Sequence, residues 1–273
     1  MRGRRGAADW EIDVLPALTP HALSTCIEWH FAEAGDLAAR VHAAKAAGLD
    51  AVEFHLWRDK PMDAIAQALD ETGVSLTGVC VDPRRSIVDP AERAEMLAAV
   101  ADTIAATATL GRPPLIVASG FRVEGMSEAD HFANAVAVLK QAAAMAEEAG
   151  VILLLEPLNT RLFSAMYLVS TTLGLDIVEA VGSPNLRLLY DVWHSAVMGE
   201  DMAHVLAGRM HLVAHVQVAD MEDRNEPGTG SVDWPTITAT LRDLGYQGAI
   251  GLEYFPTVPM DASLELTRKT LAL

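Results

Sequence analysis

The sequence is poor in cysteine, in positive charge and in long apolar runs. Its only two cysteines, Cys26 and Cys80, are too few for a disulfide framework and match no zinc-finger spacing. Lys and Arg number 20 against 37 Asp and Glu, and the resulting net charge of −17 disfavours binding to nucleic acid or to an anionic membrane. The basic start, Met1–Arg5, is not followed by the apolar core of a signal peptide, and no later run reaches about 18 apolar residues. We therefore expect a cytoplasmic protein with small-molecule partners and with neither nucleic-acid nor membrane partners.

What the chain has instead is a regular alternation of short apolar runs with long alanine-rich stretches of helical spacing. The expected strands are Leu23–Ile27, Ala51–Phe54, Ser75–Val79, Leu115–Ala118, Val151–Leu155, Leu186–Tyr190, Leu212–Val216 and Ala249–Leu252. The expected helices are Asp36–Ala47, Met62–Thr72, Pro90–Leu110, Ser127–Glu148, Thr171–Val181 and Pro235–Leu244. This alternation predicts an α/β fold in which eight parallel strands close into a (β/α)₈ TIM barrel.

The length of the chain fits one such barrel. A (β/α)₈ barrel typically has about 250 residues, and 51% hydrophobic content in 273 residues is sufficient for a large core. We expect residues 1–273 to form a single domain in which residues 1–20 are an irregular leader. No linker or internal repeat separates a second domain, and association into a homo-oligomer stays open.

Four polar residues stand at the ends of consecutive predicted strands. They are Glu156, Asp191, Gln217 and Glu253, at intervals of 35, 26 and 36 residues, each about the length of one strand, one helix and two loops. Parallel strands would bring all four to the C-terminal end of the barrel, where such barrels carry their chemistry. Three carboxylates gathered there would repel one another unless a cation lay between them, and all-oxygen ligands favour Mg²⁺ or Mn²⁺ over zinc. We therefore predict that these residues bind one divalent metal ion.

Seven short motifs, mostly in the second half of the chain, occur together in a known family. They are Glu156-Pro-Leu-Asn-Thr-Arg161, Gly182-Ser-Pro-Asn-Leu186, Tyr190-Asp-Val-Trp-His194, Gln217-Val-Ala-Asp220, Arg224, Glu226-Pro-Gly-Thr-Gly230 and Gly251-Leu-Glu-Tyr254. In this order and with these gaps the sequence resembles the hydroxypyruvate isomerases, which belong to the larger xylose isomerase-like group of TIM barrels. The resemblance is strongest from about residue 150 to residue 256.

The resemblance implies a role for each matching residue. Glu156, Asp191, Gln217 and Glu253 fall on the family's metal-ligand positions, and the two glutamates also fall on its acid/base pair. His194 and Arg224 match residues that orient the substrate. The implied activity is isomerisation of a small keto-acid or keto-sugar, in which the two glutamates transfer a proton through a metal-bound enediolate.

Other polar and aromatic residues lie near the same predicted end of the barrel. Glu53 and His55 stand at the end of the second predicted strand, Trp57 lies just beyond them, and Trp193 precedes His194. We expect these residues to take part in substrate binding, either in the pocket wall or directly behind it.

Differences from the family in the pocket loops leave the substrate open. Leu162-Phe-Ser-Ala165 and Ser195-Ala-Val-Met198 replace the segments usual in hydroxypyruvate isomerases, and the third strand ends without the histidine often found there. A sugar epimerase, a keto-sugar lyase or deglycosidase on the same metal site, a hydride shift in place of proton transfer, and a non-catalytic metabolite-binding barrel stay as alternatives. The related apurinic endonucleases are disfavoured, because the chain lacks their histidine-rich three-zinc pattern and the basic groove that DNA requires.

Overall fold

The computed structural model describes residues 15–272, in which eight parallel strands form a closed barrel. The strands are β1 (Leu23–Cys26), β2 (Ala51–Phe54), β3 (Ser75–Cys80), β4 (Leu115–Val117), β5 (Leu153–Leu155), β6 (Leu186–Asp191), β7 (Val213–Val218) and β8 (Ile250–Leu252). They pair in sequence order, and β1 pairs with β8 to close the barrel. The predicted (β/α)₈ fold is confirmed.

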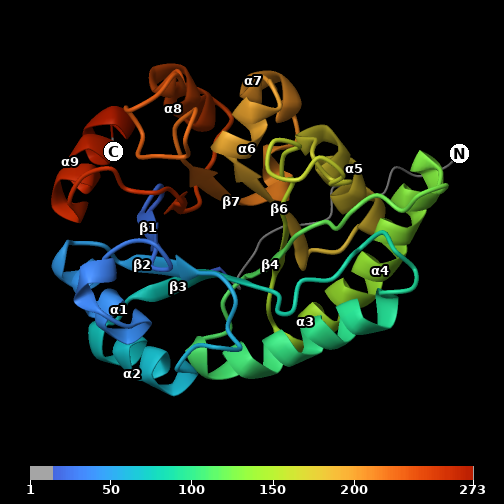
Figure 1. The fold of residues 1–273 in the computed structure, drawn as a ribbon, viewed down its shortest axis with the longest axis horizontal. Helices are drawn as coiled ribbons and strands as arrows, with labels where there is room; N and C mark the ends of the chain where they lie inside the picture. Colours follow the sequence, from blue (N-terminus) through green and yellow to red (C-terminus); the bar gives the residue numbers. More distant parts are fainter. Residues whose placement is uncertain (1–14, 273) are drawn as a thin grey trace, which may run out of the picture.

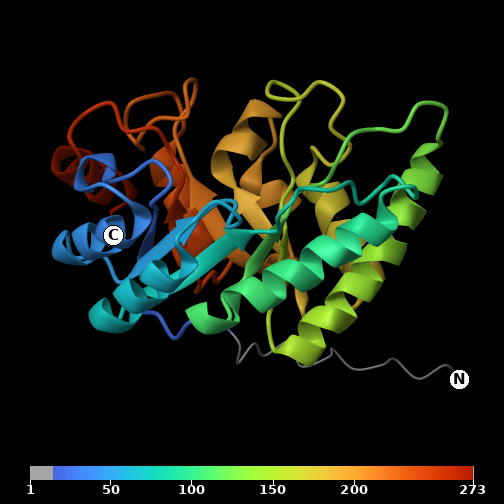
Figure 2. The same ribbon diagram turned by 60° about the horizontal axis from the view of Figure 1, so that its bottom comes forward.

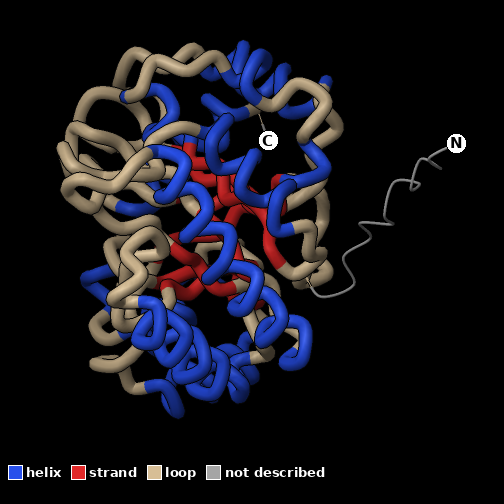
Figure 3. The backbone as a smooth tube through the Cα atoms, turned by 90° about the vertical axis from the view of Figure 1, so that its right-hand side faces the viewer, coloured by secondary structure: helices blue, strands red, loops and turns tan. Residues whose placement is uncertain are grey.

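Helices surround the strands and connect one to the next (Figure 1, Figure 3). They are α1 (Leu37–Ala46), α2 (Met62–Thr72), α3 (Arg93–Thr107), α4 (Glu128–Ala149), α5 (Thr171–Val181), α6 (Val192–Val197), α7 (Met202–Val205), α8 (Trp234–Asp243) and α9 (Met260–Leu271), with short 3₁₀ turns at Ala32–Ala34, Ala108–Leu110 and Met210–Leu212. All six expected helices are present. The short helices α6 and α7 and the last helix α9 were not predicted from the sequence.

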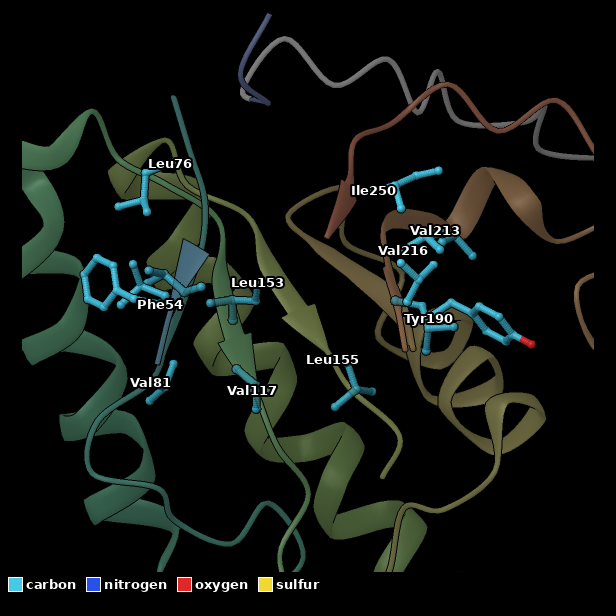
Figure 4. Close-up of a cluster of buried hydrophobic side chains, with 14 of the residues drawn as sticks. Phe54, Leu76, Val81, Val117, Leu153, Leu155, Tyr190, Val213, Val216 and Ile250 are labelled. Carbon is cyan, nitrogen blue, oxygen red and sulfur yellow. The ribbon is translucent and has the colours of Figure 1, made fainter. Parts of the chain in front are cut away.

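Side-chain alternation along the strands builds two apolar layers. Leu153 and Leu155 face outward and belong to the layer between barrel and helices, part of which Figure 4 shows. Leu154, between them, belongs to a separate and smaller buried cluster with Ile116 and Leu189. Successive side chains of a strand point to opposite faces, so this second cluster fills the inside of the barrel. Because both layers are buried, they hold the strand ends in place around the C-terminal end of the barrel.

Long loops rise together at one end of the barrel (Figure 2). They follow β4, β5 and β7 and span residues 118–127, 156–170 and 219–233. This is the end to which the carboxyl termini of the strands lead, and the predicted site residues lie there.

The start of the chain precedes the barrel. Residues 15–20 contain no helix or strand, and the first 14 residues of the predicted leader lie outside the described part of the chain. Between residues 15 and 272, no helix combines the length and the apolar character needed to cross a membrane.

Candidate active site

The C-terminal ends of β5 to β8 bring the four predicted metal ligands together. Glu156 and Glu253 directly follow β5 and β8, Asp191 ends β6, and Gln217 lies one residue before the end of β7. Strand pairing sets Gln217 beside Asp191 on one side and beside Gly251 on the other. All four side chains are buried. A cavity of about 250 Å³ opens above them, and its polar lining consists of His55, Arg84, Glu156, His194, Gln217, Arg224 and Glu253.

The carboxylates form a cluster that can hold a metal ion. Carboxylate oxygens of Glu156 and Asp191 and a ring nitrogen of His194 all lie within 4.8 Å of one another, so the two carboxylates can share one cation. Burial raises the pKa of Glu156 well above its ordinary value, and the carboxylates of Glu253 and Asp191 raise it further. Burying several like charges is strongly unfavourable unless a counter-charge accompanies them. The cluster is therefore suited to a divalent cation.

A hydrogen-bond network inside the barrel orients the amide of Gln217. Its Nε2 donates to Glu53 Oε1 at 2.8 Å, and Nε2 of His215 donates to Glu53 Oε2 at 2.7 Å. Within residues 15–272, Gln217 Oε1 is buried without a hydrogen-bond partner. An unsatisfied buried carbonyl oxygen costs about 1–3 kcal/mol, and a hard cation that prefers oxygen ligands would satisfy it. The residues present therefore fit the predicted metal.

Arg224 reaches into the carboxylate cluster from the loop after β7. Its Nη2 donates to Asp191 Oδ2 at 2.9 Å and to Glu253 Oε2 at 2.7 Å. Burial alone would raise the pKa of Glu253, but Arg224 and His55 together lower it to about 2. Glu253 is thus held ionised while Glu156 favours the protonated form. Two carboxyl groups with opposite proton preferences are the usual arrangement of an acid and a base.

The loop that carries Arg224 is held by a buried aspartate. Asp220 accepts hydrogen bonds from the backbone of Gly228 and Val232 and from the indole of Trp234. These bonds maintain a loop in which Arg224 has a φ of +61°, a left-handed conformation that costs a non-glycine residue about 1–2 kcal/mol. The Trp193 ring lies 4.7 Å from the guanidinium carbon and restrains it further.

Asn159 fixes the tautomer of His194. Asn159 Oδ1 accepts from the backbone N–H of Leu162 at 2.9 Å, so its Nδ2 is the atom that faces His194 and donates to Nδ1 at 2.9 Å. Nε2 of His194 then carries the ring proton, 3.5 Å from Asp191 Oδ2 and 3.7 Å from Glu156 Oε1. Burial lowers the pKa of His194 and keeps the ring neutral. Because a protonated nitrogen cannot ligate a metal, His194 offers a hydrogen bond at the site.

The remaining substrate-binding candidates fall in different places. His55 lines the cavity, with Nε2 2.9 Å from Glu253 Oε1. Trp193 stands behind Arg224 and outside the cavity lining. Glu53 lies beneath Gln217, and the Trp57 indole donates to Thr103 Oγ1 of α3 at 2.9 Å, so neither side chain reaches the cavity. This geometry gives Glu53 and Trp57 no direct contact with a substrate bound there.

Two residues of the site were missed by the sequence analysis. Asn159 lies within a family motif, but nothing in its spacing indicates that it orients His194. Arg84, in the loop after β3, lines the cavity beside Cys80. It lies in the half of the chain where the family motifs are weakest, so no pattern marked it.

Comparison with known proteins identifies the family. Residues 41–270 match the xylose isomerase-like TIM barrel family, and the chain belongs to it. A putative hydroxypyruvate isomerase of Streptomyces coelicolor is 36% identical over 80% of this chain and 85% of its own length. The 2-oxo-tetronate isomerase of Cupriavidus necator is 28% identical over 82% of this chain and 89% of its own. The resemblance seen in the motifs is thereby confirmed, and the protein is an enzyme of the isomerase or epimerase class.

Solved structures share the barrel along nearly its whole length. An AP endonuclease of family 2 from Brucella melitensis superimposes with a TM-score of 0.82 at 25% identity, over 90% of this chain and 96% of that one. A D-psicose 3-epimerase from Clostridium cellulolyticum, solved with D-tagatose, gives a TM-score of 0.76 at 20% identity, over 92% and 99% of the two chains. The second likeness establishes the fold alone.

Proposed function

We propose that this protein is a divalent-metal-dependent isomerase that moves the carbonyl group of a small keto-acid or keto-sugar to the neighbouring carbon. The observation that carries the proposal is the convergence of Glu156, Asp191, Gln217 and Glu253 at one end of the barrel, with the unpaired oxygen of Gln217 buried among them. Relatives named as isomerases of hydroxypyruvate and 2-oxo-tetronate support it. The cavity of about 250 Å³ suits a substrate of a few carbons, since pockets for drug-sized ligands occupy roughly 300–1,000 Å³.

Glu156, Asp191, Gln217 and Glu253 would hold one Mg²⁺ or Mn²⁺ ion. When bound, the cation polarises the carbonyl and hydroxyl oxygens of the substrate and lowers the energy of the charge that develops on them. Formal charge supports a divalent ion: with Glu156 ionised as a ligand, the three carboxylates and the Arg224 guanidinium leave two negative charges, which such a cation balances.

The two glutamates would carry out the proton transfer. Ionised Glu253 removes a proton from the hydroxyl-bearing carbon, and an enediolate forms as that carbon's electrons shift toward the carbonyl. Glu156 then delivers a proton to the former carbonyl carbon, and the hydroxyl hydrogen passes from one oxygen to the other. One proton is removed from carbon and one is returned, so the product is an isomer of the substrate.

Hydrogen-bond donors beside the pair would stabilise the intermediate. Nε2–H of His194 and the guanidinium of Arg224 both face the cavity in which negative charge develops on the substrate oxygens. Trp29, Leu162 and Phe163 are among the apolar residues of the lining and limit the access of water.

A metal analysis joined to a substrate panel tests the proposal. The protein as purified and after dialysis against a chelator would be analysed for metal and assayed with hydroxypyruvate, 2-oxo-tetronate and neutral ketohexoses. We expect about one divalent ion per chain, loss of keto-acid isomerisation after chelation and its recovery with Mg²⁺ or Mn²⁺. Undiminished turnover by the metal-free protein, or epimerisation of ketohexoses with no isomerisation of either keto-acid, would overturn it.

A further inference from the structure

The cavity wall contains an arginine, Arg84, that forms no close ion pair with an acidic residue of the described chain, although Glu156 and Glu253 act on it through space. Arg84 is exposed and lines the cavity together with Glu156, His194 and Glu253. Across residues 15–272, no Asp or Glu carboxylate forms an ion pair with it. Its neighbours differ in this respect, because Arg85 pairs with Glu95 at 2.7 Å and Arg122 pairs with Glu128.

Arg84 stands where the catalytic cavity meets a second one. The second cavity has a volume of about 470 Å³, and Arg84, Ala118, Leu158 and Phe163 line both cavities. Apart from Arg84, the shared wall is apolar. At the boundary between the two cavities, a molecule that extends from the carboxylate cluster therefore meets one charged group, and that group is positive. Beyond this boundary the second cavity is lined by charged residues of both signs, Arg85, Asp89, Glu92 and Arg122.

The charge balance of the site indicates what this group can bind. With a divalent ion in place, Glu156, Asp191, Glu253 and Arg224 are formally neutral together when Glu156 is ionised and carry one positive charge when it is protonated, and in either case Arg84 adds a further positive charge. A neutral sugar would leave that charge without a partner. A substrate with one carboxylate would balance it, and the planar fork of a guanidinium matches a carboxylate in a bidentate arrangement.

We propose that Arg84 binds the carboxylate of the substrate and thereby makes the enzyme selective for keto-acids over neutral ketoses. The inference rests on the proposed function, since it assigns the two ends of the substrate to two parts of one cavity. The carbons that exchange protons lie at Glu156 and Glu253, and the carboxylate lies at Arg84. No bond is made or broken at Arg84, which acts in binding and orientation.

The test compares a charged substrate with its neutral counterpart in a charge-neutralised variant. Hydroxypyruvate and dihydroxyacetone differ only in that a carboxylate replaces a hydroxymethyl group. Loss of a hydrogen bond to a charged group in Arg84→Gln should raise KM for hydroxypyruvate roughly 10- to 100-fold, because such bonds carry that range of affinity. KM for dihydroxyacetone should stay within about twofold of the wild-type value by the same reasoning. Arg93→Gln, at the start of α3 and in the lining of neither cavity, is the control and should change neither value.

Binding of D-glycerate and of glycerol, measured by calorimetry on the metal-loaded protein, gives a readout that does not depend on turnover. Arg84→Gln should weaken D-glycerate binding while glycerol binding stays unchanged, and Arg84→Lys should restore part of it. Equal effects on charged and neutral ligands would overturn the inference, as would stronger discrimination in favour of a phosphorylated ketose. If the wild-type enzyme isomerises neither keto-acids nor ketoses, the proposed function fails. If it isomerises ketoses but no keto-acid, the role of Arg84 fails while the proposed function stands. If it isomerises keto-acids and Arg84→Gln is indistinguishable from it, the role of Arg84 alone fails.

Discussion

Asn159 donates an amide hydrogen to Nδ1 of His194 across 2.9 Å, and this bond determines which ring nitrogen carries the proton beside the carboxylate cluster. The amide cannot turn over without losing the bond that its oxygen accepts from Leu162. The proton of the neutral ring therefore sits on Nε2, the nitrogen nearest to Asp191 and Glu156. Asn159, which does not line the cavity, thus makes Nε2 of His194 a hydrogen-bond donor.

Replacing Asn159 with Asp should reverse that tautomer. A carboxylate at this position accepts a hydrogen from Nδ1 and leaves Nε2 with a lone pair, so the donor is lost and kcat should fall roughly 100-fold, the low end of what general acid–base positioning contributes. The ¹H–¹⁵N spectrum of the imidazole reports the tautomer independently of activity. Asn134→Asp, a partly buried amide on α4, serves as the control. A wild-type spectrum that already shows the proton on Nδ1 would contradict this reading.

Replacing Asp191 should remove the metal ion, whereas replacing His194 should remove a hydrogen bond and leave the metal in place. Asp191→Ala deletes a predicted ligand and should abolish binding of Mn²⁺, while His194→Ala should retain the metal and lower kcat by about 100-fold through the lost hydrogen bond. Calorimetric titration of each variant with Mn²⁺, beside a thermal melt to verify folding, separates the two roles. Equal loss of metal from both variants would make His194 a ligand.

Gly251 leaves the space that the buried glutamate network occupies. A Cβ at this position would lie 2.8 Å from both Glu53 Oε2 and His215 Nε2, where little can move. Gly251→Ala should lower the free energy of unfolding by about 1–3 kcal/mol and weaken metal binding about 10-fold, because Gln217 loses its positioning partner. In Gly78→Ala the added carbon would press only on the flexible side chain of Ile116, at 3.0 Å, and would touch Glu53 Cβ at an ordinary 3.8 Å, so the loss should be smaller. Urea unfolding and metal titration of both variants give the comparison, and equal losses would remove this role of Gly251.

His30 should make stability depend on pH. It is fully buried, its Nε2 donates to the carbonyl of Tyr254 at 2.9 Å, and burial lowers its pKa to about 4. The unfolded chain binds this proton more tightly, with a pKa of about 6.5, so stability is complete above pH 6.5 and falls as the pH drops toward 4. The share of His30 is about 3 kcal/mol between pH 7 and pH 4, at 1.36 kcal/mol per pKa unit. Urea unfolding across this range should show a shallower slope in His30→Gln than in the wild-type protein, and an unchanged slope would contradict this role of His30.

The barrel could be predicted from the sequence because its signals are local. Each strand is a short apolar run and each expected helix has its own apolar periodicity. A residue that directly follows a parallel strand must lie at the C-terminal end of the barrel. Glu156, Asp191 and Glu253 could be placed by that argument alone. Helices α6 and α7 could not, since they are one or two turns long and depend on caps such as Asp191 and Asp201 instead of an apolar stripe.

The contacts that organise the site could not be predicted, because they join segments far apart in the chain. Glu53 and Gln217 are 164 residues apart and meet only because the closed barrel brings the side chains of β2 and β7 together in its interior. Strand-end position left open whether Glu53 lies in the pocket wall or directly behind it, and barrel closure places it under Gln217, outside the cavity lining. The place of Arg84 in the cavity lining could not be predicted either, because it depends on the conformation of the loop after β3.

The proton-transfer mechanism itself can be tested by running the reaction of a keto-acid substrate to low conversion in D₂O and following both carbons by NMR. If Glu253 and Glu156 remove and return protons through an enediolate, the product should carry solvent deuterium at the carbon that receives the proton, and Glu156→Gln and Glu253→Gln should each be inactive. Complete retention of the substrate's own hydrogen in the product would contradict the account and indicate a hydride shift, and turnover that persists in both variants would contradict the roles of the two glutamates.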